Sequence, residues 1–227
     1  MIDGHIEHKD SMGNTGNLGS GDAQLMKAGS GVIHSEMPKQ KNGRMRGFQL
    51  WINLPAAKKM DHPEYQEYSA DVFPVIEESG YRTKVIMGRY GEVASPIQDE
   101  VTQVTYLDIE LLPGHRFLSP LPEQNNSFLY LFEGALHLNH QQVSIDTLVT
   151  VGHGDHNAEL VASEQGARFI MVSGKPINEK IVQYGPFVMN RKDEIDQALQ
   201  DFQSNSFVHD RAWINRKHDA PEQGPKA

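Results

Sequence analysis

Gly29-Ser30-Gly31-Val32-Ile33-His34-Ser35-Glu36-Met37-Pro38 is the stretch that says most about the fold of this chain. Read as a β-strand, it directs side chains two residues apart to the same face. His34 and Glu36 can therefore point an imidazole and a carboxylate into one cavity. Nitrogen together with carboxylate oxygen suits Fe, Mn, Ni, Zn or Cu. Two ligands alone do not make a tight site, so a metal centre here needs further donors.

The sequence around this stretch consists of short apolar runs separated by Gly, Asn, Asp and Pro, which is typical of an all-β sandwich or barrel. Residues 48–54 alternate cleanly, with Phe48, Leu50, Ile52 and Leu54 on one face. A second strand is predicted over 101–112, and a fourth over 168–172. The third covers 128–132, and we expect Glu133-Gly134 to turn it back into 136–138.

A single helix is predicted near the C-terminus. Asn190 can cap it, and Asp193 and Glu194 favour the positive end of the helix dipole. Its apolar face is formed by Ile195, Leu199 and Phe202. The residues from 216 onward are polar and are expected to be frayed.

A weak internal repeat divides the chain. Phe48 and Pro55 bracket one predicted strand, and Phe169 and Pro176 bracket another at the same spacing. Each copy has a turn glycine, but the second copy has two more strands before its glycine than the first. The expected domains are a first barrel over 1–95, incomplete at its N-terminus, and a second barrel over 96–227 that includes the helix and the tail.

The composition excludes several classes of function. The formal charge of −9 leaves no basic surplus for a nucleic-acid backbone. The absence of cysteine excludes disulfides, thiolate zinc sites and iron–sulfur clusters. No apolar run reaches transmembrane length, and the first residues are too polar for a signal peptide. We therefore expect a cytoplasmic protein that binds neither nucleic acid nor membrane.

The chain resembles the pirin family, which has two barrels and belongs to the cupin superfamily. The resemblance spans nearly the whole chain and is most specific across residues 21–55. The matching segments are 6–14, 19–26, 28–38, 47–55, 59–60, 63–66, 113–114, 131–134 and 185–190.

This resemblance implies two tandem cupin β-sandwich barrels and one mononuclear metal, usually iron, in the first. Pirins hold the metal with three histidines and one glutamate, of which His34 and Glu36 match two. The other two histidines belong to a His-Pro-His-Arg-Gly-Phe-Glu motif that precedes the segment matching Met1 and is not in this sequence. We expect weak iron retention, together with an open barrel edge through which the chain can form a homodimer. A third interpretation is that the start is truncated, either because the chain is a fragment or because the initiator methionine is misassigned.

Other histidines are weaker candidates as ligands. His5 and His8 are the nearest spare imidazoles, although His8 matches a family position that is not a ligand. In the second barrel only Glu123 is chemically suitable where a metal cupin carries its histidines. The segment His153-Gly154-Asp155-His156 is predicted to be a solvated turn, and His137 and His140 to be surface residues.

Two functions follow from the resemblance. The first is that of a metal-dependent quercetin 2,3-dioxygenase, with a flavonol as substrate, His34 as ligand and Glu36 as ligand or base. We expect its activity to be low in this chain because two ligands are missing. The alternative is a non-enzymatic module that binds a protein partner, either a transcriptional regulator or a metabolic enzyme.

Overall fold

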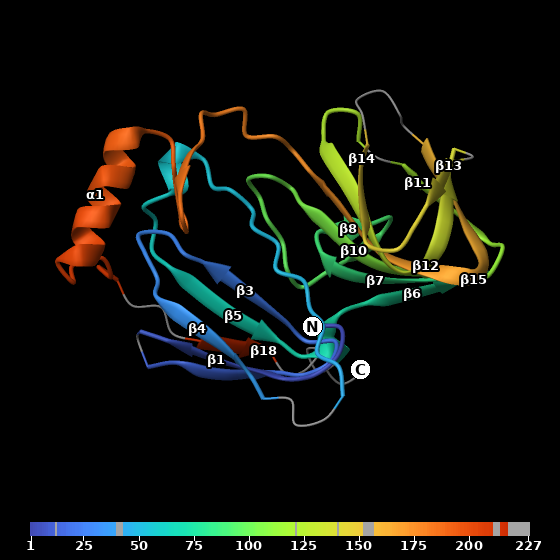
Figure 1. Cartoon of the computed structure of the whole chain (residues 1–227), viewed down its shortest axis with the longest axis horizontal. Helices are drawn as coiled ribbons and strands as arrows, with labels where there is room; N and C mark the ends of the chain where they lie inside the picture. Colours follow the sequence, from blue (N-terminus) through green and yellow to red (C-terminus); the bar gives the residue numbers. More distant parts are fainter. Residues whose placement is uncertain are drawn as a thin grey trace, which may run out of the picture. The chain divides into compact units, whose positions relative to one another are not determined.

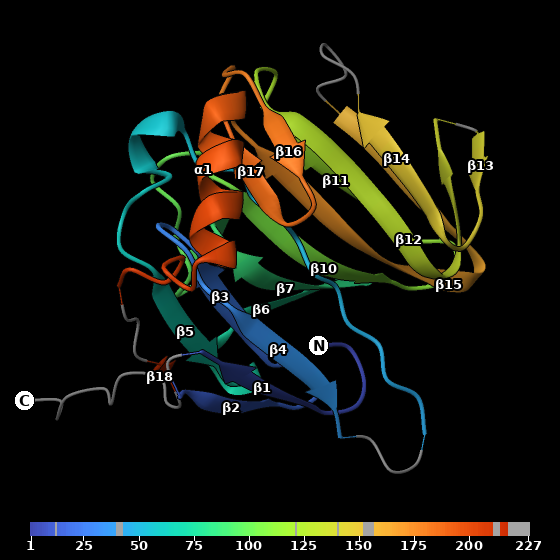
Figure 2. The ribbon, with the colours of Figure 1, turned by 60° about the vertical axis from the view of Figure 1, so that its left-hand side comes forward.

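A computed structural model describes residues 1–11, 13–39, 43–120, 122–139, 141–151, 157–210 and 214–217. The chain divides into two compact units, Met1–Val72 with Ile177–Ala227, and Phe73–Pro176. Figures 1 and 2 show that strands dominate both units. The predicted all-β architecture with one short C-terminal helix is confirmed.

The first unit contains two three-stranded sheets. One has the order β2-β1-β4 and the other the order β18-β5-β3, in which β18 runs parallel to β5. A hairpin, β16–β17, and the helix α1 complete the unit (Figure 2). The strands are β1 (Ile6–Asp10), β2 (Thr15–Leu18), β3 (Ala23–Lys27), β4 (His34–Pro38), β5 (Glu64–Tyr68), β16 (Val182–Tyr184), β17 (Phe187–Met189) and β18 (Ile214–Lys217); α1 spans Lys192–Gln203.

The second unit is built on an eight-stranded sheet of order β13-β12-β15-β10-β7-β6, in which β11 also pairs with β15 and β14 with β12. A separate two-stranded ribbon is formed by β8 and β9. The strands are β6 (Val75–Glu78), β7 (Tyr81–Met87), β8 (Arg89–Tyr90), β9 (Val93–Ala94), β10 (Thr105–Leu111), β11 (Arg116–Pro120), β12 (Asn126–Leu138), β13 (Gln141–Val143), β14 (Thr147–Val151) and β15 (Asn157–Gly174).

The large apolar core lies in the second unit. Leu107, Ile109 and Leu111 share one face of β10 and are at most 1% exposed, as their alternation predicts. They pack with buried side chains from β7, β11, β12 and β15, among them Val85, Phe117, Leu129, Leu131, Leu160 and Phe169. Burial of this apolar set is the main favourable contribution to the folding of the unit.

The Glu133-Gly134 pair is not the predicted turn. Strand β12 continues through this pair without a turn. The pairing of β12 with β15 shifts register on both sides of the pair. Gly134 has φ 74°, and a Cβ there would lie 2.1 Å from the Gly166 carbonyl oxygen. The glycine therefore allows two backbones to approach closely at a β-bulge, which bends a long strand instead of reversing it.

Residues 48–54 do not form the predicted strand. Phe48, Leu50 and Ile52 are partly buried while Gln49 and Trp51 are exposed, so the expected two faces are present. Within the described residues, however, the segment pairs with no other strand. Alternation reports which side of an extended segment is buried, and strand formation also requires a partner edge.

The two units differ from the predicted domains 1–95 and 96–227. Strand β7 pairs with β10, and this pairing draws residues 75–87 into the sheet of the second unit. The helix belongs to the first unit. It begins one residue later than predicted: Arg191 is the N-cap, and its backbone N–H donates to Glu194 Oε2 at 2.8 Å.

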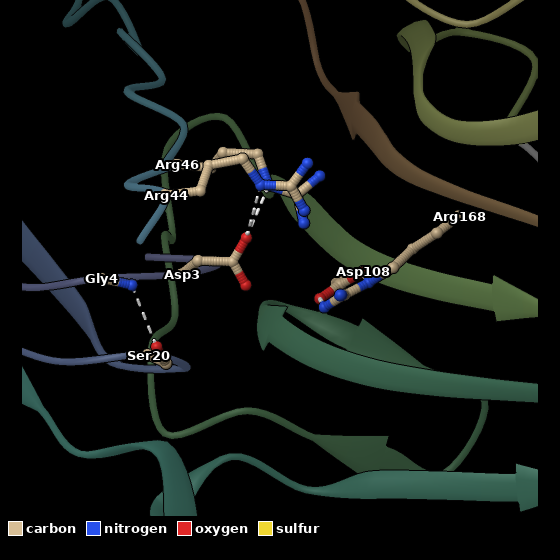
Figure 3. Close-up of polar contacts among 7 residues, drawn as sticks. All are labelled: Asp3, Gly4, Ser20, Arg44, Arg46, Asp108 and Arg168. Atoms are coloured by element: carbon tan, nitrogen blue, oxygen red, sulfur yellow. Dashed lines mark hydrogen bonds and ion pairs between the residues drawn. The ribbon is translucent and has the colours of Figure 1, made fainter. Parts of the chain in front are cut away.

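Each unit contains an arginine–aspartate pair (Figure 3). In the second unit Arg168 donates from Nε and Nη2 to the two oxygens of Asp108, at 3.0 and 2.7 Å. In the first unit Asp3 Oδ2 accepts from Arg46 Nε at 2.7 Å. The Asp108 side chain is only 8% exposed, so the bidentate geometry matters most there.

Alkaline pH is expected to unfold the second unit. Burial raises the pKa of Tyr90 and of Tyr106 well above the usual value of 10.0. Both phenols stay neutral in the folded state, while the unfolded chain ionises them above pH 10. Stability is therefore fully present below about pH 10 and is lost as the pH rises further. Thermal melts between pH 8 and 11 should show this loss, and Tyr106→Phe should reduce its steepness; an unchanged slope would contradict the assignment.

None of the helices in the described part of the chain combines the length and the apolar character needed to cross a membrane.

Candidate metal centre

The predicted site residues lie on one face of the β2-β1-β4 sheet. In the β1–β4 ladder His8 is opposite Glu36, and Asp10 is opposite His34. Directly opposite residues of an antiparallel pair share a face, as do residues two apart on one strand. His34 and Glu36 therefore point to the same side, as predicted. His34 is exposed and Glu36 is partly buried.

Glu36 is held in place by residues of the other sheet. Gln24 on β3 donates from Nε2 to Glu36 Oε1 at 2.6 Å. The Tyr65 hydroxyl on β5 donates to Gln24 Oε1 at 2.6 Å, which fixes which end of the amide faces Glu36. Burial raises the pKa of Tyr65, so this hydroxyl keeps its proton. The second carboxylate oxygen of Glu36 remains for another interaction.

Glu67, also on β5, is a second carboxylate inside the unit. It is 5% exposed, and its Oε1 lies 3.1 Å from the Tyr65 hydroxyl. A Cβ at Gly16 on β2 would lie 1.5 Å from that oxygen. The glycine thus provides the space in which the buried carboxylate sits.

His8 lies opposite Glu36 in the β1–β4 ladder and therefore on the same face as the predicted site residues. It is 0% exposed, and neither ring nitrogen has a hydrogen-bond partner among the residues that the structure describes. Its ring stacks on Tyr65 at 4.5 Å and lies 5.6 Å from the His34 ring, centroid to centroid. Burial, followed by the nearby His34, lowers the pKa of His8 and favours the neutral imidazole. The available signal was its position between Glu7 and Lys9, because alternation turns it away from these charged neighbours.

The residues present do not supply a complete mononuclear centre. The described part of the chain contains no group of three or more histidine, aspartate or glutamate side chains that could hold a metal ion. His34 and Glu36 remain two adjacent donors. His5 is engaged elsewhere, since its Nε2 lies 3.1 Å from Asn17 Oδ1. A tight site of the predicted kind requires about four ligands.

The other histidine candidates do not alter this result. His137 is exposed on β12, as predicted for a surface residue. Glu123 is also exposed. His140 and the segment 153–156 lie outside the described residues.

The chain contains two β-sandwich units. The second is closed around an apolar core, and the first is lined by imidazole, carboxylate, amide and phenol groups. This architecture is that of a tandem cupin protein. Family models agree: the pirin model matches residues 1–52 and the pirin C-terminal cupin model matches residues 106–208. The chain belongs to the pirin family.

Individual relatives support this membership. A pirin-like protein of Caulobacter vibrioides is 40% identical over 91% of this chain and 75% of its own length. Human pirin is 33% identical over 94% of this chain and 75% of its own length. A crystal structure of quercetin 2,3-dioxygenase from Acinetobacter baumannii superposes with a TM-score of 0.80 and 30% identity, covering 91% of this chain and 73% of that one.

Proposed function

We propose that this protein is a metal-dependent oxygenase of the quercetin 2,3-dioxygenase type, with His34 and Glu36 as ligands and iron as the metal. The observation that carries the proposal is the hydrogen bond from Gln24 Nε2 to Glu36 Oε1. It orients a carboxylate beside an imidazole on one sheet face. The similarity to the A. baumannii quercetin 2,3-dioxygenase supports a flavonol as the class of substrate.

The residues of the chain have distinct tasks in this proposal. A bound metal would supply Lewis acidity toward a flavonol oxygen and open positions for O₂. The oxygen of Glu36 that Gln24 does not occupy would serve either as a metal ligand or as the base that accepts the hydroxyl proton of the substrate. Tyr65 and Gln24 position that carboxylate and do not touch the substrate.

A cytoplasmic location stays a prediction.

Quercetin turnover should be slow and should follow metal content. Two protein donors leave the ion largely hydrated and weakly held. With Fe(II) added anaerobically and O₂ then admitted, quercetin consumption is expected to fall about tenfold or more in His34→Ala. The matched control is His137→Ala, an exposed imidazole on another strand. Turnover that is equal in His34→Ala, or that survives chelation, would disprove the proposal.

A second candidate is a module that binds a protein partner, and the exposure of two large side chains favours it. Trp51 is 59% exposed and Met60 is 60% exposed. Trp and Met are enriched in protein interfaces, where Trp often dominates binding energy. The two functions separate experimentally: binding of a basic partner that is lost in Trp51→Ala but retained in His34→Ala would support the module.

A further inference from the structure

The second unit contains a cavity lined by residues of strand β6 and of the β8–β9 ribbon, whose strands β6 and β8 are labelled in Figure 1. Its volume is about 410 Å³, which is within the range of small-molecule sites in proteins. This β6–β8 cavity shares no residue with the candidate metal centre, which belongs to the first unit. The lining residues are Ile76, Glu78, Tyr90, Gly91, Glu92 and Val93.

Two exposed carboxylates line this cavity, those of Glu78 and Glu92. Neither forms an ion pair within the described part of the chain, whereas Glu77, on the other face of β6, pairs with Arg82 at 3.8 Å. Arg89 is close in sequence, but its Nη2 donates to the backbone carbonyl of Glu92 at 3.2 Å. The cavity therefore presents uncompensated negative charge, which is complementary to a cation.

The remaining walls are apolar or aromatic. Ile76, Tyr90 and Val93 also pack against the apolar core of the unit. Burial, together with a hydrogen bond to Tyr81, raises the pKa of Tyr90, so its phenol stays neutral and adds no charge. A ligand in this cavity can therefore place an apolar body against these walls and still reach the carboxylates.

A hydroxyl without a partner lies on the same side of the sheet. Thr83 on β7 is 0% exposed, and its Oγ1 has no hydrogen-bond partner among the described residues. Thr83 is opposite Ile76 in the β6–β7 ladder, and Tyr81 is opposite Glu78. Because directly opposite residues share a face, the Thr83 side chain is on the face that bears Ile76 and Glu78. A buried hydroxyl left unpaired is costly, and a polar group of a ligand can satisfy it.

We propose that the β6–β8 cavity binds a small primary amine whose apolar body ends in a hydroxyl group. The ammonium group pairs with Glu78 and Glu92, and the body packs against Ile76 and Val93. The hydroxyl at the far end exchanges a hydrogen bond with Thr83 Oγ1, which is otherwise unpaired. This ligand supplies the charge, the apolar surface and the polar group that the cavity lacks.

Tyramine is a probe with all three features. Isothermal titration of the full chain with tyramine at low salt should show saturable binding at one molecule per chain, and added salt should weaken it. Phenethylamine, which has no hydroxyl, should bind about fivefold more weakly. The anion 4-hydroxyphenylacetate has the same ring and hydroxyl but the opposite charge, and it should show no saturable binding.

Substitutions separate the two polar contacts. Glu78→Gln/Glu92→Gln should weaken tyramine binding about tenfold, because both ion pairs are lost. The matched control is Glu77→Gln, on the other face of β6, which should bind like the parent. Thr83→Val should abolish the difference between tyramine and phenethylamine. Its melting temperature should equal or exceed that of the parent, since the unpaired hydroxyl is removed.

The outcomes that would overturn the inference are specific. They are the absence of saturable tyramine binding, and tyramine binding that is equal in Glu78→Gln/Glu92→Gln and in the parent. Equal binding of tyramine and phenethylamine by the parent would overturn the contact with Thr83 and with it the class of ligand. His34→Ala should bind tyramine normally, and a loss there would place the site in the first unit. None of these results bears on quercetin turnover, so the proposed function is tested separately.

Discussion

Phe117→Ala is expected to lower the free energy of unfolding of the second unit by about 3–5 kcal/mol. Phe117 is 0% exposed. Its ring meets Tyr81 edge-on at 5.1 Å and Phe169 at 6.1 Å, centroid to centroid. Truncation removes these aromatic contacts and leaves a cavity between strands that are already fixed by their ladders. Urea unfolding followed by circular dichroism measures the loss.

The next residue of β11 provides the control for this prediction. Leu118 is 60% exposed and points to the other face of the strand. Leu118→Ala should change the free energy of unfolding by no more than about 0.5 kcal/mol. A Phe117→Ala protein that unfolds at the same urea concentration as Leu118→Ala would show that the core of this unit lies elsewhere.

Arg168→Met is expected to cost about 3 kcal/mol, because it leaves the Asp108 carboxylate buried without its partner. Arg168 donates two hydrogen bonds to Asp108 (Figure 3), and its guanidinium lies 5.3 Å from the Phe132 ring centroid. The Asp108 side chain is only 8% exposed. Water therefore cannot replace the two hydrogen-bond donors that the substitution of Arg168 removes. The midpoint of thermal unfolding reports the effect.

Two comparisons make this prediction specific. In the double variant Asp108→Leu/Arg168→Met most of the lost stability should return, because no charge is left uncompensated. Arg82→Met breaks an exposed pair whose nitrogen–oxygen distance to Glu77 is 3.8 Å, and it should cost less than about 1 kcal/mol. Equal losses in Arg82→Met and Arg168→Met would show that burial of Asp108 does not matter.

The second unit was the more predictable from sequence. The alternation of Leu107, Ile109 and Leu111 marks a strand with one buried face, and the structure has β10 there. Strand β15 includes the predicted strand 168–172, but it begins earlier, at Asn157, and continues to Gly174. An apolar core requires apolar residues at regular spacing, so its strands are visible in the sequence. The turn predicted at Gly134 was wrong because a β-bulge, like a turn, can require a glycine with positive φ.

The first unit was less predictable because its interior is polar. His34 and Glu36 were identified from their spacing and from the family resemblance, and the structure places them on one face. The burial of His8 and Glu67 could not be inferred, since charged and titratable residues are usually at the surface. His8 is surrounded by residues distant in sequence, such as Tyr65 on β5, which also contacts Glu67 on the same strand.

The division of the chain has a consequence for biosynthesis. The first unit contains both Met1–Val72 and Ile177–Ala227, so the second unit is inserted within it. Strand β5 pairs with β18, whose residues leave the ribosome last among those described. The inserted unit can therefore fold while translation continues, whereas the first unit must wait until β18 has been made. We expect chains that stall before β18 to contain a folded second unit and an incompletely folded first unit.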